Sequence, residues 1–265
     1  MLEIAKQAAR EAGGILMDAF GRLVSDQVDL KGSGDYVTDL DKRSEAIIIR
    51  RIRGVYPDHV IQAEESGWGE GGASVRWIID PLDGTANYVQ SIPVFAVSIA
   101  AVENNELRVG VIFDPVHDEL FWAEKGMGAF LNGRPIHVSG KKELAYSMLA
   151  SGFPWRSKEY VKPYLACFRE LFMDAAGIRR MGAAAIDLAY TACGRFDGFW
   201  EMKLHAWDIA AGILIIEEAG GRVTDFHGGR DFLNTGNVVA GNIHIQPKIL
   251  KIVRNHLSKT GSEEE

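Results

Sequence analysis

The spacing of apolar residues predicts helices at the start of the chain and strands after them. Apolar positions recur at helical spacing over residues 1–20 and again over 39–55, and Pro57 follows the second helix. Short apolar runs bounded by turn residues predict strands at 60–63, 77–79, 94–102, 107–113 and 119–123. Because the last three runs have short connections, we expect antiparallel pairing there. The polar segment 31–35 is expected to be a mobile loop and 70–74 a surface turn.

Beyond residue 146, predicted strands and helices alternate. Strands are expected at 147–150, 178–181, 196–202 and 238–241, and helices at 159–173, 183–193, 207–219 and 246–257. The pattern therefore predicts a layered α/β (α+β) protein, with an N-terminal α+β half at 1–145 and a C-terminal α/β half at 146–265 that form one continuous unit.

Composition and charge exclude several classes of protein. The 265 residues are 47% hydrophobic and 25% charged, which is typical of a folded globular chain and not of a disordered or fibrous one. A net charge of −7 argues against a broad basic surface for nucleic acid, although a local basic patch stays open. The longest apolar run, 209–216, is too short to span a bilayer, and the first residues do not resemble a secretory signal. Cys167 and Cys193 are too few for a disulfide framework, so we expect a cytoplasmic protein without a membrane partner.

Two aspartates stand where the short predicted strand 77–79 ends. The segment reads Asp80-Pro81-Leu82-Asp83-Gly84-Thr85, and no lysine or arginine stands close to it in the sequence. A buried carboxylate without a partner is costly, so each aspartate needs one. Carboxylates and carbonyl oxygens at a rigid strand end suit Mg²⁺. A turn with solvated aspartates is the alternative that this segment leaves open.

Two further acidic residues adjoin predicted core elements. Glu64 follows the strand 60–63, and Asp208 begins a helix that is apolar almost all round and is therefore expected to be buried. Interaction with the helix dipole would account for Asp208 alone. The helix dipole does not explain why several carboxylates each adjoin a core element. A cation bound by all of them would explain it.

Small residues at two predicted helix starts could bind an anion. Gly84-Thr85 and Gly182-Ala183-Ala184-Ala185 place backbone N–H groups at helix N-termini without bulky side chains. Close packing of helices is the alternative for the second segment.

The chain resembles the inositol monophosphatase family. The segments that carry the resemblance are Glu64-Glu65-Ser66, Trp77 to Thr85, and Trp207-Asp208-Ile209-Ala210-Ala211-Gly212, in the family's order and spacing. The similarity covers nearly the whole chain, although alanines follow Gly182 where many relatives have serine or threonine. The resemblance implies a five-layer αβαβα sandwich of the inositol monophosphatase and fructose-1,6-bisphosphatase type. It also implies two or three Mg²⁺ ions, sensitivity to lithium and a homodimer, with metal-site motifs in the first half and an active site that the second half completes.

The resemblance also implies roles for individual residues. The metal ligands would be the side chains of Glu64, Asp80, Asp83 and Asp208 and the carbonyl of Leu82. Asp41 and Thr85 would orient the attacking water and share the catalytic role with Glu64; helix capping is the alternative for Asp41 and Thr85. Substrate contacts would come from Asp83, Gly84, Thr85, Gly182, Ala183, Ala184, Glu201 and Asp208. We leave His205 out of the ligand set and assign no role to Lys31.

These features predict a Mg²⁺-dependent phosphomonoesterase that hydrolyses myo-inositol 1-phosphate or a related sugar-alcohol phosphate. Alternatives with the same fold are fructose 1,6-bisphosphate or phosphoadenosine nucleotides as substrates, or a regulatory role with an RNA-polymerase-associated partner. A haloacid-dehalogenase-type phosphatase is disfavoured, because that family's two aspartates stand two residues apart and here they stand three apart.

Overall fold

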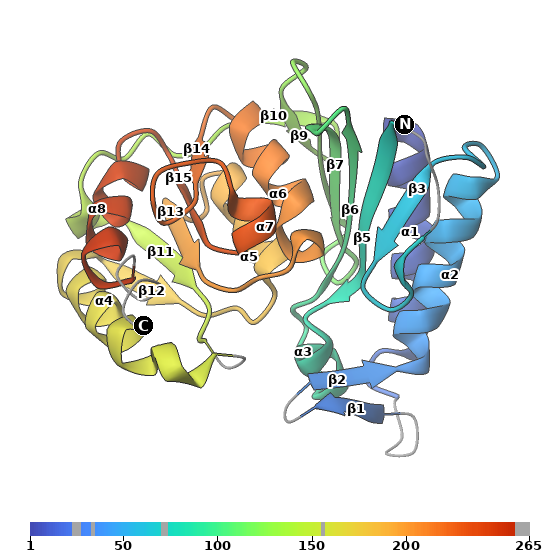
Figure 1. Ribbon diagram of the computed structural model, residues 1–265, viewed down its shortest axis with the longest axis horizontal. Coiled ribbons are helices and arrows are strands. Elements are labelled where there is room, and N and C mark those ends of the chain that lie inside the picture. The colour runs from blue at the N-terminus through green and yellow to red at the C-terminus, as the bar shows by residue number, and fades with distance from the viewer. Residues whose placement is uncertain (23–27, 33–34, 70–73, 155–156, 258–265) are drawn as a thin grey trace, which may run out of the picture.

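The structure is a computed structural model that describes residues 1–22, 28–32, 35–69, 74–154 and 157–257. Five layers follow one another across the molecule in the order helices, sheet, helices, sheet, helices (Figure 1). This arrangement confirms the αβαβα sandwich. Within the described residues, no helix has the length and apolar character that crossing a membrane requires.

The first two layers come from the N-terminal half. Helices α1 (Leu2–Ala19) and α2 (Asp39–Arg53) pack on each other and on the outer face of a large sheet. Among the described residues, that sheet has the strand order β10-β9-β8-β7-β6-β5-β3-β4. Its strands are β3 (Val60–Ala63), β4 (Gly67–Trp68), β5 (Val75–Asp83), β6 (Ala96–Glu103), β7 (Glu106–Asp114), β8 (Glu119–Glu124), β9 (Ala129–Leu131) and β10 (Arg134–Ile136). Its pairs are antiparallel except β3 with β5, which is parallel.

The middle layer consists of α5 (Ala184–Ala192) and α6 (Ala206–Glu218), which contact both sheets. Residues 209–216 of α6 are all buried, as the apolar sequence predicts for a helix enclosed between two sheets. The two helices therefore join the halves of the chain around a common core.

The last two layers come from the C-terminal half. In the described part of the chain, the second sheet has the order β12-β11-β13-β15-β14. Its strands are β11 (Met148–Ser151), β12 (Gly177–Arg179), β13 (Gly198–Glu201), β14 (Arg222–Thr224) and β15 (Val238–Gly241). Helices α4 (Val161–Asp174) and α8 (Gln246–Leu257) cover its outer face. The remaining elements are β1 (Val28–Gly32), β2 (Asp35–Thr38), α3 (Thr85–Val89), α7 (Phe232–Thr235) and short 3-10 turns at Leu144–Tyr146 and Lys158–Tyr160.

Two predictions about local structure are wrong. The loop expected at 31–35 is wrong for Lys31, Gly32 and Asp35, which belong to the antiparallel strands β1 and β2, while residues 33–34 lie outside the described part. The strand expected at 77–79 runs on to Asp83. Of the surface turn expected at 70–74, residues 70–73 lie outside the described part. The division of the chain at residue 145 stays a prediction.

Candidate metal centre

The acidic segment of β5 is held inside the large sheet. Asp80 pairs with Ser98 of β6, and regular pairing resumes at Asp83 after an irregularity in the register. Pro81, which has no N–H to donate, falls within that irregularity. The Ser44 hydroxyl of α2 donates to the carbonyl of Pro81 at 2.8 Å. Pairing with β6 and contact with α2 carry the strand past residue 79, and within the irregularity the N–H of Leu82 donates to Oδ1 of the buried Asp80 at 3.0 Å.

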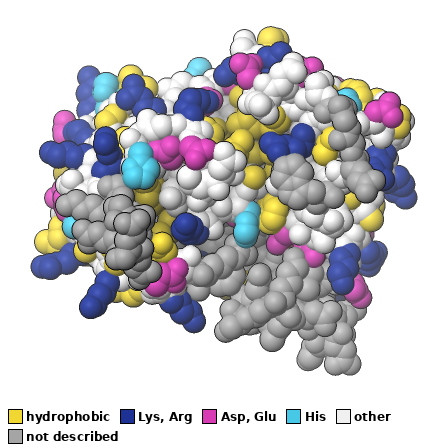
Figure 2. All heavy atoms as spheres, viewed as in Figure 1, with side chains coloured by type: hydrophobic (Ala, Val, Ile, Leu, Met, Phe, Trp, Pro, Cys, Tyr) yellow, Lys and Arg dark blue, Asp and Glu magenta, His cyan; other side chains and the backbone are white. Residues whose placement is uncertain are grey.

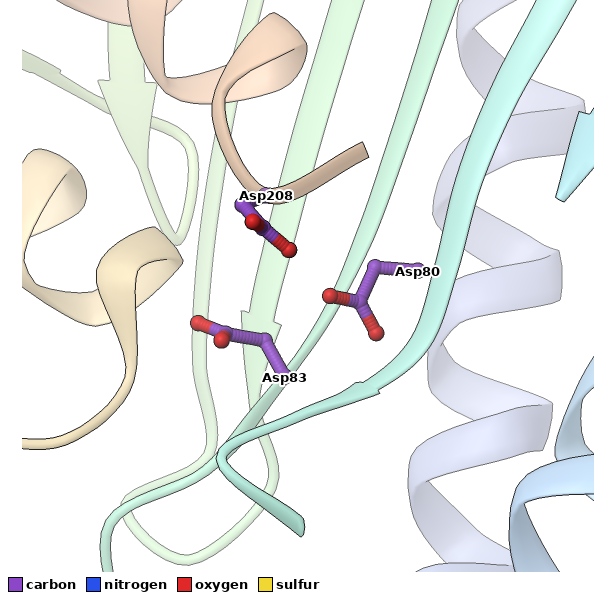
Figure 3. A group of neighbouring side chains, drawn as sticks. All are labelled: Asp80, Asp83 and Asp208. Carbon is purple, nitrogen blue, oxygen red and sulfur yellow. The ribbon is translucent and has the colours of Figure 1, made fainter. Parts of the chain in front are cut away.

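Three carboxylates meet at this point. Asp80 and Asp83 from β5 and Asp208 from the first turn of α6 each offer an oxygen, and these oxygens all lie within 4.8 Å of one another. Figure 3 shows the three side chains pointing toward a common space between the strand and the helix. The sequence placed these residues on different elements, and the fold brings them together.

The electrostatics of this group fit a cation. Burial, together with repulsion from Glu64, Asp83 and Asp208, raises the pKa of Asp80 well above its ordinary value. Burial and then the Asp208 carboxylate raise the pKa of Asp83 to about 8. Carboxylates that repel one another in a buried place are stabilised by a divalent cation, and oxygen ligands of this kind suit Mg²⁺.

Glu64 lies at the rim of this group. It follows β3, its backbone N–H donates to the carbonyl of Ile79 at 3.2 Å, and its carboxylate contributes to the raised pKa of Asp80. It is not among the three residues whose oxygens converge within 4.8 Å. Behind it, Oε2 of the buried Glu45 accepts the N–H of Glu65 at 2.8 Å and so fixes the turn after β3. Sequence reasoning did not single out Glu45.

Asp41 and Thr85 form a pair, although they stand on different elements. Oγ1 of Thr85 lies 3.2 Å from Oδ1 of Asp41 and 2.9 Å from the carbonyl oxygen of Leu82. Thr85 is the first residue of α3, and Gly84, with φ of +90°, occupies the N-cap position. The capping alternative for Thr85 is therefore wrong. Asp41 lies in the first turn of α2 and is buried.

The two segments expected to bind an anion lie against each other. A Cβ added to Gly84 would lie 3.1 Å from the Cβ of Ala183, which is the N-cap residue of α5. Asn87 supports both segments, since its Nδ2 donates to the carbonyls of Val94 and Met181 at 2.9 Å each. A side chain at Gly182 would collide with Asn87 and Arg180. Nothing in the local sequence around Asn87 signals this role.

Two of the amides expected to be free are already bonded. The N–H of Ala185 donates to Oδ2 of Asp83 at 2.6 Å, and a hydrogen bond from the N–H of Ala184 also acts on the Asp83 carboxylate. The start of α5 thus binds a carboxylate of the acidic centre. The expectation of a fully free helix start is wrong for these amides, because β5 ends directly below α5.

Glu201 is the last residue of β13, and its carboxylate lies against the backbone of Gly152. A Cβ added to Gly152 would lie 1.9 Å from Oε1 of Glu201, so a side chain there would displace the carboxylate. Glu201 and Asp83 both contribute to a raised pKa of Asp187, for which burial is the main cause. No described residue donates a hydrogen bond to Oδ1 of Asp187. The sequence signal for Asp187, an acidic residue within the apolar α5, was missed.

His205, which we leave out of the ligand set, has ordinary structural surroundings. The His205 ring stacks on Trp207 at 4.6 Å between centroids, and its backbone N–H donates to Oδ2 of Asp208 at 2.7 Å. Lys31 lies in β1, and its side chain is outside the described part.

The layered fold and the buried acidic centre define a class of α/β proteins in which carboxylates from a central strand and an enclosed helix share one site. Over residues 1–258 the chain matches the inositol monophosphatase family, and it belongs to that family, whose members are generally metal-dependent phosphatases. It is 47% identical to Nus factor SuhB of Pseudomonas aeruginosa over 262 residues, which cover 97% of each chain. It is 46% identical to inositol-1-monophosphatase of Mesorhizobium japonicum over 259 residues, again 97% of each chain.

Solved structures of similar proteins have the same fold. The extragenic suppressor protein suhB from Bartonella henselae superposes with a TM-score of 0.93 at 43% identity, covering 96% of this chain and 98% of that one. The inositol monophosphatase from Anabaena superposes with a TM-score of 0.85 at 41% identity and covers 97% of both chains.

Proposed function

We propose that the chain is a Mg²⁺-dependent phosphomonoesterase that hydrolyses myo-inositol 1-phosphate or a related sugar-alcohol phosphate. The observation that carries the proposal is the convergence of the Asp80, Asp83 and Asp208 oxygens within 4.8 Å, beside the start of α5. The same proposal, following the family resemblance, includes a cytoplasmic homodimer that lithium inhibits.

One group of residues would bind the metal ions. The carboxylates of Glu64, Asp80, Asp83 and Asp208 and the carbonyl of Leu82 would hold two or three Mg²⁺ ions. Bound Mg²⁺ lowers the pKa of a coordinated water and neutralises charge on the phosphoryl oxygens and the leaving group. The cluster is therefore both the binding site and the source of the catalytic charge.

The nucleophile and the substrate are positioned by neighbouring groups. Thr85, whose hydroxyl donates to the Asp41 carboxylate at 3.2 Å, would accept a hydrogen bond from the attacking water while Asp41 holds the hydroxyl in place. The backbone of Gly84, Thr85, Gly182, Ala183 and Ala184 would surround the phosphate, alongside the ligands Asp83 and Asp208. Glu201 would accept a hydrogen bond from a hydroxyl of the sugar alcohol.

A phosphate-release assay tests the proposal. The substrates are myo-inositol 1-phosphate, fructose 1,6-bisphosphate and a phosphoadenosine nucleotide, each with Mg²⁺ and with a chelator. We expect the inositol phosphate to be hydrolysed fastest and only with Mg²⁺. A different preferred substrate would keep the chemistry and change the substrate class, and release that persists in chelator would contradict the metal mechanism.

A second candidate function is regulatory. Relatives that are 46–47% identical and cover 97% of this chain bear the name Nus factor SuhB, which favours the alternative of a partner associated with RNA polymerase. That candidate runs counter to the interpretation, drawn from net charge, that the chain gives no strong sign of a nucleic-acid partner. Binding of purified RNA polymerase by the wild type and by Asp83→Asn tests it. We expect the variant to retain binding if regulation is independent of hydrolysis.

A further inference from the structure

A groove of about 740 Å³ lies at the edge of the second sheet, and no residue of the acidic centre lines it. It is formed by the edge strand β14 with the turn after it and by one side of α8. Figure 1 shows α8 and β5 on opposite sides of the molecule. In the second sheet, Arg222 of β14 pairs with Gly241, which pairs with the first residue of β13. None of Asp80, Asp83, Asp208 and Glu201 lines the groove.

The lining of this groove is positively charged. Arg222, Arg230, Lys251 and Arg254 line it, and no acidic residue is among the described residues that do so. Arg230 forms an ion pair with Glu217 at 2.6 Å, which offsets part of the charge. Helix α8 itself carries no acidic residue. In Figure 2, Lys and Arg side chains are frequent over the side of the molecule that carries α8. A chain with a net charge of −7 therefore has a locally basic groove.

A buried amide in the wall of the groove has an unused acceptor. Gln246 is fully buried, and its Nε2 donates to Oγ1 of Thr224 at 2.8 Å and to the carbonyl of Val239 at 3.3 Å. Its Oε1 accepts no hydrogen bond from any residue that the structure describes. A buried acceptor without a donor is costly, and a hydroxyl of a bound molecule that reached Oε1 after a small shift of the groove wall would remove that cost.

We propose that this groove is a second ligand site, which binds an organic phosphate that carries several negative charges and at least one hydroxyl group, such as a nucleotide. Guanidinium groups bind phosphate oxygens in a bidentate manner, and the basic residues here include three arginines. The volume lies within the range of about 300–1,000 Å³ that is usual for small-molecule sites. The groove attracts phosphate by its own charge, whereas the acidic centre repels phosphate unless cations are bound.

That difference allows the groove to be tested alone. Calorimetric titration of the full chain with ATP, in a buffer with chelator and no Mg²⁺, leaves the acidic centre unable to bind phosphate. Inorganic tripolyphosphate, which has no hydroxyl-bearing sugar, is the companion probe. We expect both to bind and ATP to bind more tightly. Equal affinities would overturn the part assigned to Gln246.

A matched pair of variants locates the binding. Arg222→Gln combined with Lys251→Gln removes two charges from the groove. Lys248→Gln removes one charge from the same helix outside the groove, where Lys248 forms an ion pair with Glu143 at 2.6 Å. We expect the dissociation constant for ATP to rise at least about tenfold in the double variant and less than about twofold in the control, a tenfold change being about 1.4 kcal/mol. Thermal melts and phosphate release with Mg²⁺ should stay at the wild-type level in both, since none of these residues belongs to the acidic centre.

Three results would overturn the proposal. The first is no heat from millimolar ATP with the wild type. The second is equal weakening by the control variant, which would mean unspecific attraction. The third is displacement of ATP by a poly-glutamate peptide of equal charge at equal concentration, which would reassign the groove to an acidic protein partner.

Discussion

Oδ2 of Asp83 accepts a hydrogen bond of 2.6 Å from the backbone N–H of Ala185, 102 residues later in the chain. This bond joins the end of β5 to the start of α5, and so fixes the acidic centre of the first half against the second half. The positive end of α5 stabilises the ionised carboxylate. Burial and the Asp208 carboxylate nevertheless outweigh it, since the pKa of Asp83 stays raised, at about 8. A bound cation would supply the further positive charge that the ionised Asp83 carboxylate needs.

Asp83→Asn should nearly abolish turnover and leave the fold intact. The substitution preserves size but removes one negative ligand, and we expect kcat to fall by ~10²–10⁴, the scale of losing one essential catalytic feature. The measurement is phosphate release with Mg²⁺, together with a circular dichroism spectrum. Asp118→Asn is the control, because Asp118 is exposed and its φ of +51° suits asparagine. Activity of Asp83→Asn within about threefold of wild type would contradict the metal-ligand role.

Mg²⁺ should raise the melting temperature of the wild type. A ligand that binds only the folded state adds about 2.7 kcal/mol to the free energy of unfolding at a hundredfold excess over Kd. Thermal melts with millimolar Mg²⁺ and with chelator measure the effect, and Asp83→Asn should show a smaller one. A wild-type melting temperature that is the same in both buffers would count against a shared metal site.

Without metal, the free energy of unfolding should fall as the pH rises. The pKa of Asp83 is about 8 in the folded state against 3.8 ordinarily, so the folded state keeps a proton that the unfolded state has lost. The stabilising contribution is therefore fully present below pH 3.8 and is lost as the pH rises through about 8. Asp80, whose pKa is raised as well, acts in the same direction.

Urea unfolding at a series of pH values in chelator measures this slope. Asp83→Asn should flatten it, since the variant has no proton to lose at that position. Mg²⁺ should flatten it too, because the cation stabilises the ionised carboxylates. A free energy of unfolding that rises between pH 5 and 8 in chelator would be the opposite of what the raised pKa values require.

Glu201→Gln should change substrate preference more than phosphate chemistry. A charge-assisted hydrogen bond contributes ~1.5–3 kcal/mol, equivalent to roughly 10–150-fold in kcat/KM. The quantity to measure is the ratio of kcat/KM for inositol 1-phosphate to that for a small aryl phosphate, which offers no matching hydroxyl. We expect the ratio to fall in the variant. A constant ratio would remove Glu201 from recognition, and an equal loss on both substrates would move it into the catalytic centre.

Gly152→Ala should reproduce the effect of Glu201→Gln without removing a charge. The added Cβ would lie 1.9 Å from Oε1 of Glu201, so the carboxylate must move. We expect kcat/KM for inositol 1-phosphate to fall at least about tenfold while the aryl ester is affected less. Gly14→Ala is the matched control, because a Cβ there meets nothing within 4 Å, and it should leave both activities unchanged. If Gly152→Ala keeps the wild-type ratio of kcat/KM for inositol 1-phosphate to that for the aryl ester, the Glu201 carboxylate needs no fixed position.

Much of the secondary structure could be predicted from the sequence because the signals are local. The helix expected at 246–257 and the strands expected at 60–63 and 238–241 have the predicted bounds, since their apolar spacing and flanking turn residues depend only on near neighbours. The layered α/β class followed from the order of these elements. The acidic motif and the family resemblance likewise rest on short segments, each made of residues that are close together in the sequence.

The tertiary structure decided how those elements meet. Asp80 and Asp83 lie within a strand because β6 pairs with them, and Asp208 joins them from another element. The bond of Ala185 to Asp83 could not be foreseen from helix signals, which treat the first amides of a helix as free. The close contact of Gly152 with Glu201 likewise arises between neighbouring strands. Sequence patterns report the preferences of the chain over a few residues. Burial, charge repulsion and hydrogen bonding in this centre depend on residues more than a hundred positions apart in the sequence, whose distances are set by packing alone.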